Sequence, residues 1–167
     1  MSSKHVDDSS VIHLQKLRNL VFLNFDGTNV TPMGYGRIIC NLPKLRNITW
    51  AKIVNAVLLT VTKDEIQTVK SLTGTVRNAL SVVVKCPIIT HLSLLEAKDN
   101  LSTLEAVSAF TLVDCDSDSV KLVKVLHVIG PALKQFDLGN VNNVSIREVT
   151  KCSIHLEILS LDSCKFI

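Results

Sequence analysis

Residues 17–30, Leu-Arg-Asn-Leu-Val-Phe-Leu-Asn-Phe-Asp-Gly-Thr-Asn-Val, combine two different spacings of apolar side chains. Leu20 and Leu23 lie three positions apart, as on one face of a helix or turn, whereas Leu23 and Phe25 lie two positions apart, as on one face of a strand. The Asp-Gly pair that follows is a turn signal. The stretch therefore predicts a turn that leads directly into a short strand, with all three apolar side chains directed inward.

The same pattern, apolar-x-x-apolar-x-apolar, recurs along the chain. Five further copies follow the first, and a weaker copy fills the one double-length gap between them. With seven copies, the central positions run from 23 to 159 and the mean step is about 23 residues, within the range of about 20 to 29 that is typical of leucine-rich repeats. After the first copy, the copies are Leu45, Ile48, Trp50; the weak Ile66, Val69, Leu72; Ile89, Leu92, Leu94; Val107, Phe110, Leu112; Leu133, Phe136, Leu138; and Leu156, Leu159, Leu161.

The spacing between copies predicts the fold class. The return from one strand to the next is too long for a hairpin, so neighbouring strands are expected to be parallel. The sequence thus predicts an α/β leucine-rich-repeat solenoid, a curved right-handed stack of about seven strand-turn-helix units with a parallel sheet on its concave face. Helices are expected over residues 36–41, 75–85, 117–129 and 145–151, the third with Val120, Val123 and Leu126 on one face.

The domain organisation follows from where the pattern begins and ends. Residues 1–13 show little of it and are interpreted as an N-terminal tail or partial cap, and residues 14–167 form the expected repeat domain. The last copy is followed by only a few residues and by no further helix. We therefore expect the domain to be truncated at its C-terminus.

Composition and charge limit the classes of partner. The chain has 167 residues, of which 47% are hydrophobic and 20% charged, with a net charge of +3 that is spread along the sequence. A folded core is expected, and neither a nucleic acid nor a membrane is expected as a partner. The polar N-terminus does not resemble a secretory signal, which indicates an intracellular protein, cytoplasmic or nuclear.

Four sequons leave a second location open. Asn29, Asn47, Asn100 and Asn143 each match the N-glycosylation pattern. The alternative is an extracellular, receptor-type leucine-rich-repeat recognition domain that lacks its signal and its caps. Glycosylation of these four residues would distinguish it.

The cysteines occupy regular places in the pattern. Cys115 and Cys164 each follow the last apolar position of a copy by three residues, where leucine-rich repeats carry Asn or Cys, and Thr28 holds this place in the first copy. A small side chain there is expected to turn inward and satisfy backbone groups that the bend leaves unpaired. Cys86, in Lys-Cys-Pro, and Cys152 instead close an expected helix just before a strand.

These motifs resemble the cysteine-containing leucine-rich repeats of F-box substrate receptors, over about residues 14–164. Val141, which stands where Cys or Asn is expected, departs from the family pattern. The resemblance implies a repeat arm that holds a substrate protein for a Skp-cullin-F-box ubiquitin ligase. The sequence contains no F-box, so the ligase core would be engaged only through a domain that is not present in this chain.

A thiol or zinc enzyme is the remaining alternative. Cys152-Ser-Ile-His155 has a spacing found in metal sites, but a closed zinc site needs four ligands and no second cluster is apparent in the sequence. Cys115 lies between Asp114 and Asp116, whose charges disfavour a thiolate nucleophile. We therefore expect no catalytic residue, no cofactor and no metal ligand.

The expected binding site is the concave face of the sheet, because alternate side chains of a strand point to opposite faces. Seven strands at a spacing of ~4.8 Å give a surface about 29 Å long, enough for a protein interface. Asp26, Asp137 and Asp162 would supply acidic points, and Phe22, Leu95 and Ile158 apolar anchors. A solvated face without a partner remains the alternative for each residue. The candidate residues are Phe22, Asn24, Asp26, Asn47, Thr49, His91, Ser93, Leu95, Thr111, Val113, Gln135, Asp137, Ile158, Ser160 and Asp162.

Overall fold

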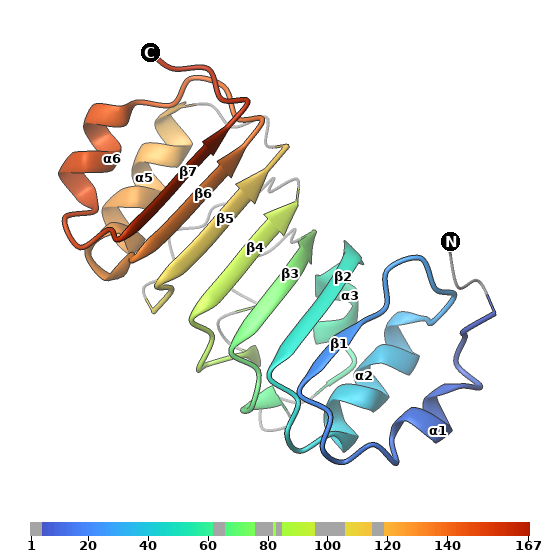
Figure 1. Ribbon diagram of the computed structural model, residues 1–167. Coiled ribbons are helices and arrows are strands. Elements are labelled where there is room, and N and C mark those ends of the chain that lie inside the picture. The colour runs from blue at the N-terminus through green and yellow to red at the C-terminus, as the bar shows by residue number, and fades with distance from the viewer. Residues whose placement is uncertain (1–4, 62–65, 76–81, 83–84, 96–105, 115–118) are drawn as a thin grey trace.

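A computed structural model of the chain describes residues 5–61, 66–75, 82, 85–95, 106–114 and 119–167. Its strands form one seven-stranded parallel sheet in the order of the chain (Figure 1). The fold is therefore α/β, and the expectation of parallel neighbouring strands is confirmed. The strands are β1 (Phe22–Asn24), β2 (Asn47–Ile53), β3 (Ser71–Thr75), β4 (His91–Leu95), β5 (Ala109–Val113), β6 (Gln135–Gly139) and β7 (Ile158–Asp162).

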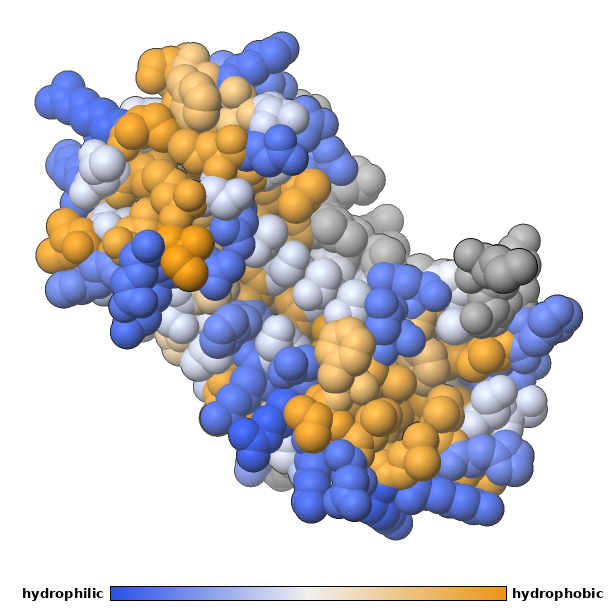
Figure 2. All heavy atoms as spheres, viewed as in Figure 1, coloured by the Kyte–Doolittle hydropathy of each residue, from blue (hydrophilic) through white to orange (hydrophobic). Residues whose placement is uncertain are grey.

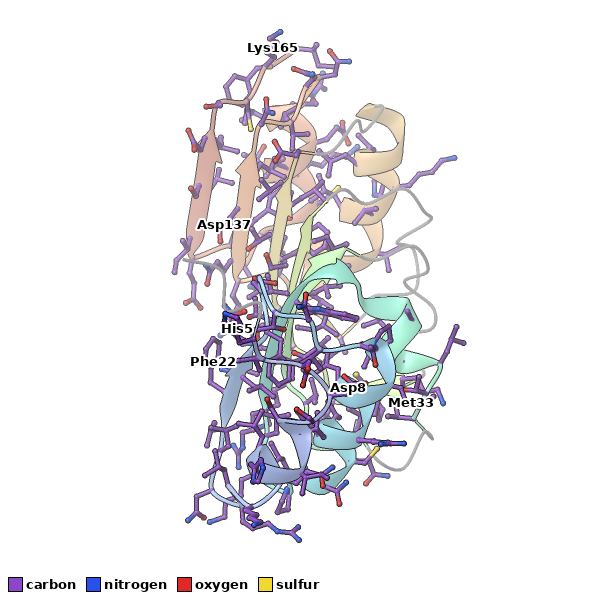
Figure 3. All side chains as sticks on the ribbon, turned by 90° about the vertical axis from the view of Figure 1, so that its right-hand side faces the viewer. His5, Asp8, Phe22, Met33, Asp137 and Lys165 are labelled. Carbon is purple, nitrogen blue, oxygen red and sulfur yellow. The ribbon has the colours of Figure 1, made fainter. Side chains whose placement is uncertain are left out.

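The helices cover one face of this sheet, and no helix of the described residues lies on the other face. Figure 3, turned by a quarter from Figure 1, shows the strands on one side of the molecule and the helices on the other. The hydrophobic core lies between the two layers. The helices are α1 (Val11–Leu14), α2 (Pro32–Asn41), α3 (Val54–Leu58), α5 (Ser119–Ile129), the short 3-10 helix η2 (Gly130–Ala132) and α6 (Ile146–Cys152).

The apolar triplets of the sequence meet in register across the sheet. The central residue of each triplet pairs with the central residue of the next strand, and all of these side chains are buried except Leu159, which lies in the edge strand β7 and is 42% exposed. Phe110 and Phe136 stack with their ring centroids 6.1 Å apart. The paired residues are Leu23, Ile48, Leu72, Leu92, Phe110, Phe136 and Leu159.

The weak copy is placed differently from the expectation. Leu72, not Val69, is the central residue that pairs with Ile48 and Leu92. The third copy is therefore Val69, Leu72 and Gly74, and Ile66 is buried outside it. A glycine at the last apolar position hid this copy from a search for three apolar side chains.

The same bend follows four of the strands. The residue four positions after the central apolar residue has a positive φ in each case: Gly27 at 73°, Asp114 at 51°, Asn140 at 52° and Ser163 at 54°. This left-handed conformation is favoured by Gly and tolerated by Asn and Asp, and it turns the chain away from the sheet. Ser163 is the least suited of the four to this conformation.

The residue after this bend turns inward, as expected for two of the copies. The Thr28 hydroxyl donates to the Phe25 carbonyl at 2.8 Å, and the Cys164 thiol donates to the Leu138 carbonyl at 3.5 Å. Val141 occupies the equivalent place with a fully buried apolar side chain. Cys115 lies outside the described residues.

The N-terminal segment holds the first long helix in place. The Asp8 carboxylate accepts hydrogen bonds from the Thr31 amide at 2.8 Å and from the Thr31 hydroxyl at 2.6 Å, and that hydroxyl accepts from the Gly34 amide. Thr31 is thus a capped N-cap, and Pro32 supplies a favourable first residue. For this reason α2 begins at Pro32, four residues before the expected start at Gly36.

The remaining helices agree with the expectations only in part. α5 and α6 lie within two residues of the expected ranges 117–129 and 145–151. On α5, Leu126 is buried as expected, but Val123 is only half-buried, and Leu122, Val125 and Ile129 complete the buried face. The helix expected over 75–85 lies largely outside the described residues, and Thr75 ends β3.

Leu92→Ala is expected to lower the free energy of unfolding by about 2 to 5 kcal/mol, because it leaves a cavity in the row of central residues. The matched control is Ser93→Ala, on the open side of the same strand, which is expected to change the stability by no more than about 0.5 kcal/mol. Urea unfolding followed by far-UV circular dichroism measures both. Equal effects of the two substitutions would contradict the assignment of the two faces.

Candidate functional site

The candidate site is the sheet face opposite the helices, which we call the open face. Its side chains come from the strand positions that alternate with the buried ones, and the strand register aligns them in two rows. The first row is Phe22, Asn47, Ser71, His91, Ala109, Gln135 and Ile158. The second row is Asn24, Thr49, Thr73, Ser93, Thr111, Asp137 and Ser160.

The second row is polar at every strand. Five of its seven residues carry hydroxyl groups, one is an amide, and only Asp137 is charged. A hydroxyl both donates and accepts, so the row offers hydrogen-bonding groups of both kinds across the whole sheet. These short side chains also leave the backbone surface close to any partner that lies on it.

Asp137 is oriented by its neighbours on the open face. Its Oδ2 accepts a hydrogen bond from Gln135 Nε2 at 2.8 Å and one from Thr111 Oγ1 at 3.2 Å. In Figure 3 the Asp137 side chain stands on the strand side of the molecule. These two hydrogen bonds therefore orient the carboxylate on the open face.

A shallow depression lies in the middle of the open face. It has a volume of about 160 Å³ and spans strands β3 to β6. Its shape follows from the small side chains of the central strands, which lie between larger ones. The lining residues are Ser71, His91, Leu92, Ser93, Ala109, Thr111 and Gln135.

Apolar side chains mark the two ends of the open face. Phe22 on β1 is 54% exposed and Ile158 on β7 is 53% exposed. Figure 2 shows apolar surface gathered toward the two ends of the molecule, where α1 and α2 or α5 and α6 are also in view, and more polar surface over the strands between them. The face thus combines a polar centre with an apolar anchor at each edge.

Most of the predicted site residues lie on the open face, and a few lie beside it. Asp26 is exposed in the turn after β1, where its amide donates to Asn24 Oδ1 at 2.7 Å. Val113 and Asp162 lie two residues beyond the second row, at the ends of β5 and β7, and both are in register with Gly139. Leu95 ends β4, and its side chain lies outside what the structure describes.

Ala109 on this face is not among the predicted candidates, and Ser71 and Thr73 were missed by the sequence analysis altogether. The latter two flank Leu72 on β3, and the misplaced third copy put this strand out of register. The alternation Ser-Leu-Thr-Gly-Thr, preceded three residues earlier by Val69, is the signal that would have found them.

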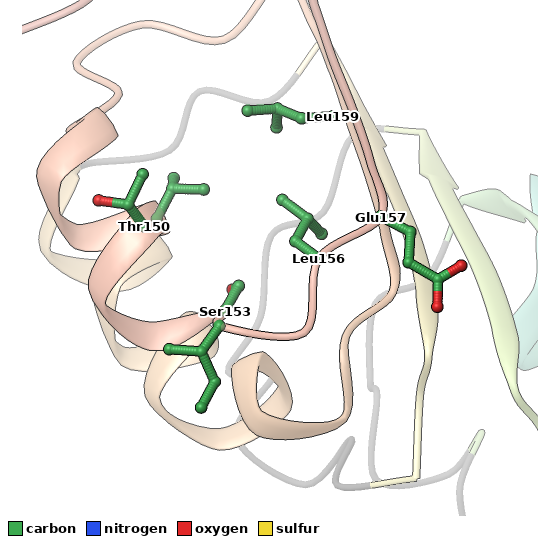
Figure 4. A pocket seen from close by; sticks show the side chains of 7 residues that line it. Thr150, Ser153, Leu156, Glu157 and Leu159 are labelled. Carbon is green, nitrogen blue, oxygen red and sulfur yellow. The ribbon is translucent and has the colours of Figure 1, made fainter.

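A second hollow lies at the outer edge of the sheet, between α6 and β7 (Figure 4). Its volume is about 350 Å³, and it is largely apolar. β7 has a single neighbouring strand, and Leu159 on it is partly exposed. Ser153 Oγ is buried there without a hydrogen-bond partner. The lining residues are Val149, Thr150, Ser153, Ile154, Leu156, Glu157 and Leu159.

The described cysteines differ in environment. Burial raises the pKa of the Cys86 thiol to about 12. The pKa of the Cys152 thiol is also raised, first by partial burial and second by the negative charge of Glu148, while the positive charge of Lys151 lowers it. Both shifts disfavour the thiolate that a nucleophile needs. Cys152 Sγ lies 3.6 Å from Nδ1 of His127, a residue of α5, and not beside the sequence neighbour His155.

The sequons and the helices are relevant to glycosylation and to membrane insertion. Asn29, Asn47 and Asn143 are exposed, and Asn47 stands on the open face, whereas Asn100 lies outside the described residues. Within the part of the chain that the structure describes, every helix is too short or too polar to cross a bilayer.

Comparison with known proteins adds no family assignment. No protein-family model matches the chain, and no curated protein matches it. The function therefore rests on the chemistry of the surfaces described above.

The buried thiol predicts a loss of stability at alkaline pH. The pKa of Cys86 rises from 9.0 to about 12 on folding, so the unfolded chain releases this proton first as the pH increases. The contribution of the protonated Cys86 thiol to the free energy of unfolding is present below pH 9. It is lost between pH 9 and about 12, at up to about 1.4 kcal/mol per pH unit.

Cys86→Ala is expected to be less stable at neutral pH but to show a flatter fall over that window. Tyr35, whose pKa is also raised by burial, acts with the same sign in both proteins and cancels from the comparison. Urea unfolding at several pH values measures the two slopes. Parallel slopes would contradict the burial of this thiol.

Proposed function

We propose that the chain is a leucine-rich-repeat solenoid of the cysteine-containing subtype and that it acts as a non-catalytic protein-binding module. The apolar triplets in register, the repeated left-handed bend and the inward-turned Thr28 and Cys164 support this assignment. In this proposal the open face is the concave surface of the solenoid, and another protein binds there.

The observation that carries the proposal is the unbroken polar row across all seven strands. Only one of its seven residues is charged, and the row is flanked at its two ends by exposed Phe22 and Ile158. Aromatic side chains are enriched at protein interfaces, and such interfaces also carry about ten direct hydrogen bonds. A strand spacing of ~4.8 Å makes the face about 29 Å long, which matches one side of a standard interface.

The chemistry of the face favours a protein partner over a small molecule. Its central depression is shallow, at about 160 Å³, whereas small-molecule sites enclose roughly 300 to 1,000 Å³. Hydrogen-bond donors and acceptors spread over seven strands instead suit an extended surface. We propose that the partner is a substrate protein, as in the repeat arm of F-box ubiquitin ligases, with the ligase core engaged through a domain outside this sequence.

Blocking the centre of the open face tests the proposal. Ser93→Arg combined with Thr111→Arg places two long side chains in the central depression and is expected to weaken partner binding at least ~10-fold, which corresponds to about 1.4 kcal/mol. The matched control is Lys124→Glu with Arg147→Glu, two exposed changes on α5 and α6, which should leave binding unchanged.

The measurement is quantitative affinity capture with the full chain, followed by dissociation constants for the purified partner. Far-UV circular dichroism must show that each variant keeps its fold. A partner that binds the open-face variant as tightly as the wild type would rule out the open face as the binding site.

Charge reversal at Asp137 and Asp162 tests the role of these two carboxylates. Asp137→Lys with Asp162→Lys is expected to weaken a partner that offers donors or a basic side chain to these residues, because the oriented carboxylate becomes a repelling cation. If the partner is charged, the same change should also alter how strongly the association rate depends on ionic strength, because salt screens interactions between charges. Stopped-flow measurements at two salt concentrations check this, and an unchanged affinity would remove both aspartates from the site.

A further inference from the structure

We propose that His127, Glu148 and Cys152 form a zinc-binding site that joins helices α5 and α6. One ligand atom from each of the three side chains lies within 4.8 Å of the other two. The three residues come from two helices that pack against each other on the side of the molecule opposite the open face. The site is thus separate from the proposed protein-binding surface.

The distance between the sulfur and nitrogen ligand atoms fits a tetrahedral metal. Zinc binds thiolate sulfur at about 2.3 Å and imidazole nitrogen at about 2.05 Å, which places two such ligands about 3.6 Å apart at the tetrahedral angle. Cys152 Sγ and His127 Nδ1 lie 3.6 Å apart. The same distance also suits a simple thiol-imidazole hydrogen bond, so the third residue decides between the two.

The position of Glu148 favours a metal site over a simple hydrogen bond between His127 and Cys152. It precedes Cys152 by four residues on α6, so both side chains project from the same face of the helix. A hydrogen bond between His127 and Cys152 does not require a carboxylate, which instead adds negative charge beside the sulfur. Among the described residues Glu148 forms no salt bridge, and a divalent cation would balance its charge.

The backbone holds the two helix ends at this separation. A Cβ on Gly130 would lie 2.5 Å from the Cys152 carbonyl oxygen and 3.1 Å from the Cys152 Cβ, so only glycine allows the chain after α5 to pass there. This contact fixes Cys152 beside the last turn of α5, which carries His127. The ligands are therefore positioned by the fold and not by long flexible segments.

Three protein ligands leave a fourth position for water. His127 is exposed and the other two residues are half-buried, so a metal ion can enter from solvent. Nitrogen, sulfur and oxygen ligands in this number are a set that zinc accepts. The sequence pointed to Cys152 and His155 because of their spacing, and the fold supplies His127 in place of His155.

Cobalt(II) titration of the full chain tests the site, because cobalt replaces zinc and reports thiolate ligation through a charge-transfer band in the near ultraviolet. One equivalent is expected to bind, and Cys152→Ser should abolish the band. His127→Gln and Glu148→Gln should each weaken cobalt binding at least ~10-fold. Two matched controls, His155→Gln and Cys40→Ser, should bind as the wild type does.

A second readout is thermal unfolding with and without added zinc. Zinc should raise the midpoint of the wild type and of both controls, but not that of Cys152→Ser. If Cys152→Ser fails to fold, the exposed substitution His127→Gln decides the outcome. A wild type without the thiolate band, or a band that keeps its strength in both His127→Gln and Glu148→Gln, would overturn the proposal.

Discussion

The structure depends on one constraint: a strand of this chain can bury its apolar side chains only when other segments pack beside it and over one face of it. Leu72, Leu92 and Phe110 are almost fully inaccessible because each pairs in register with a residue of the same kind. Leu159 has a neighbour on one side only and stays 42% exposed. Parallel order, short strands and the helical layer all follow from this requirement, since each return must bring the chain back to the start of the next strand.

The division into two faces is a consequence of the same register. Once Phe110 and Leu112 point to the helices, Thr111 between them must point away, and the same holds on every strand. The side chains of the open face therefore do not contribute to the hydrophobic core, and they can be substituted without loss of core packing. Asp137 and its hydrogen bonds to Gln135 and Thr111 show how this freedom is used.

The sequence was sufficient for the architecture where apolar side chains marked it, and insufficient where they did not. Six triplets and the parallel order were predicted, whereas Gly74 concealed the third triplet and, with it, Ser71 and Thr73. The start of α2 depends on Asp8, which lies 23 residues before the helix cap in sequence. The contact between His127 and Cys152 likewise joins residues 25 positions apart, and the nearer His155 masked it. Local patterns do not encode such contacts.

The sequential order of the strands has a consequence for motion. Each strand is hydrogen-bonded only to the strands that precede and follow it in the chain, so β7 can separate from β6 without disturbing β3 or β4. The partly exposed side chains of β7 oppose that separation weakly. Local opening, and with it amide hydrogen exchange, should therefore begin at this edge and become rarer toward the middle of the sheet. The sheet would then open one strand at a time, starting from β7.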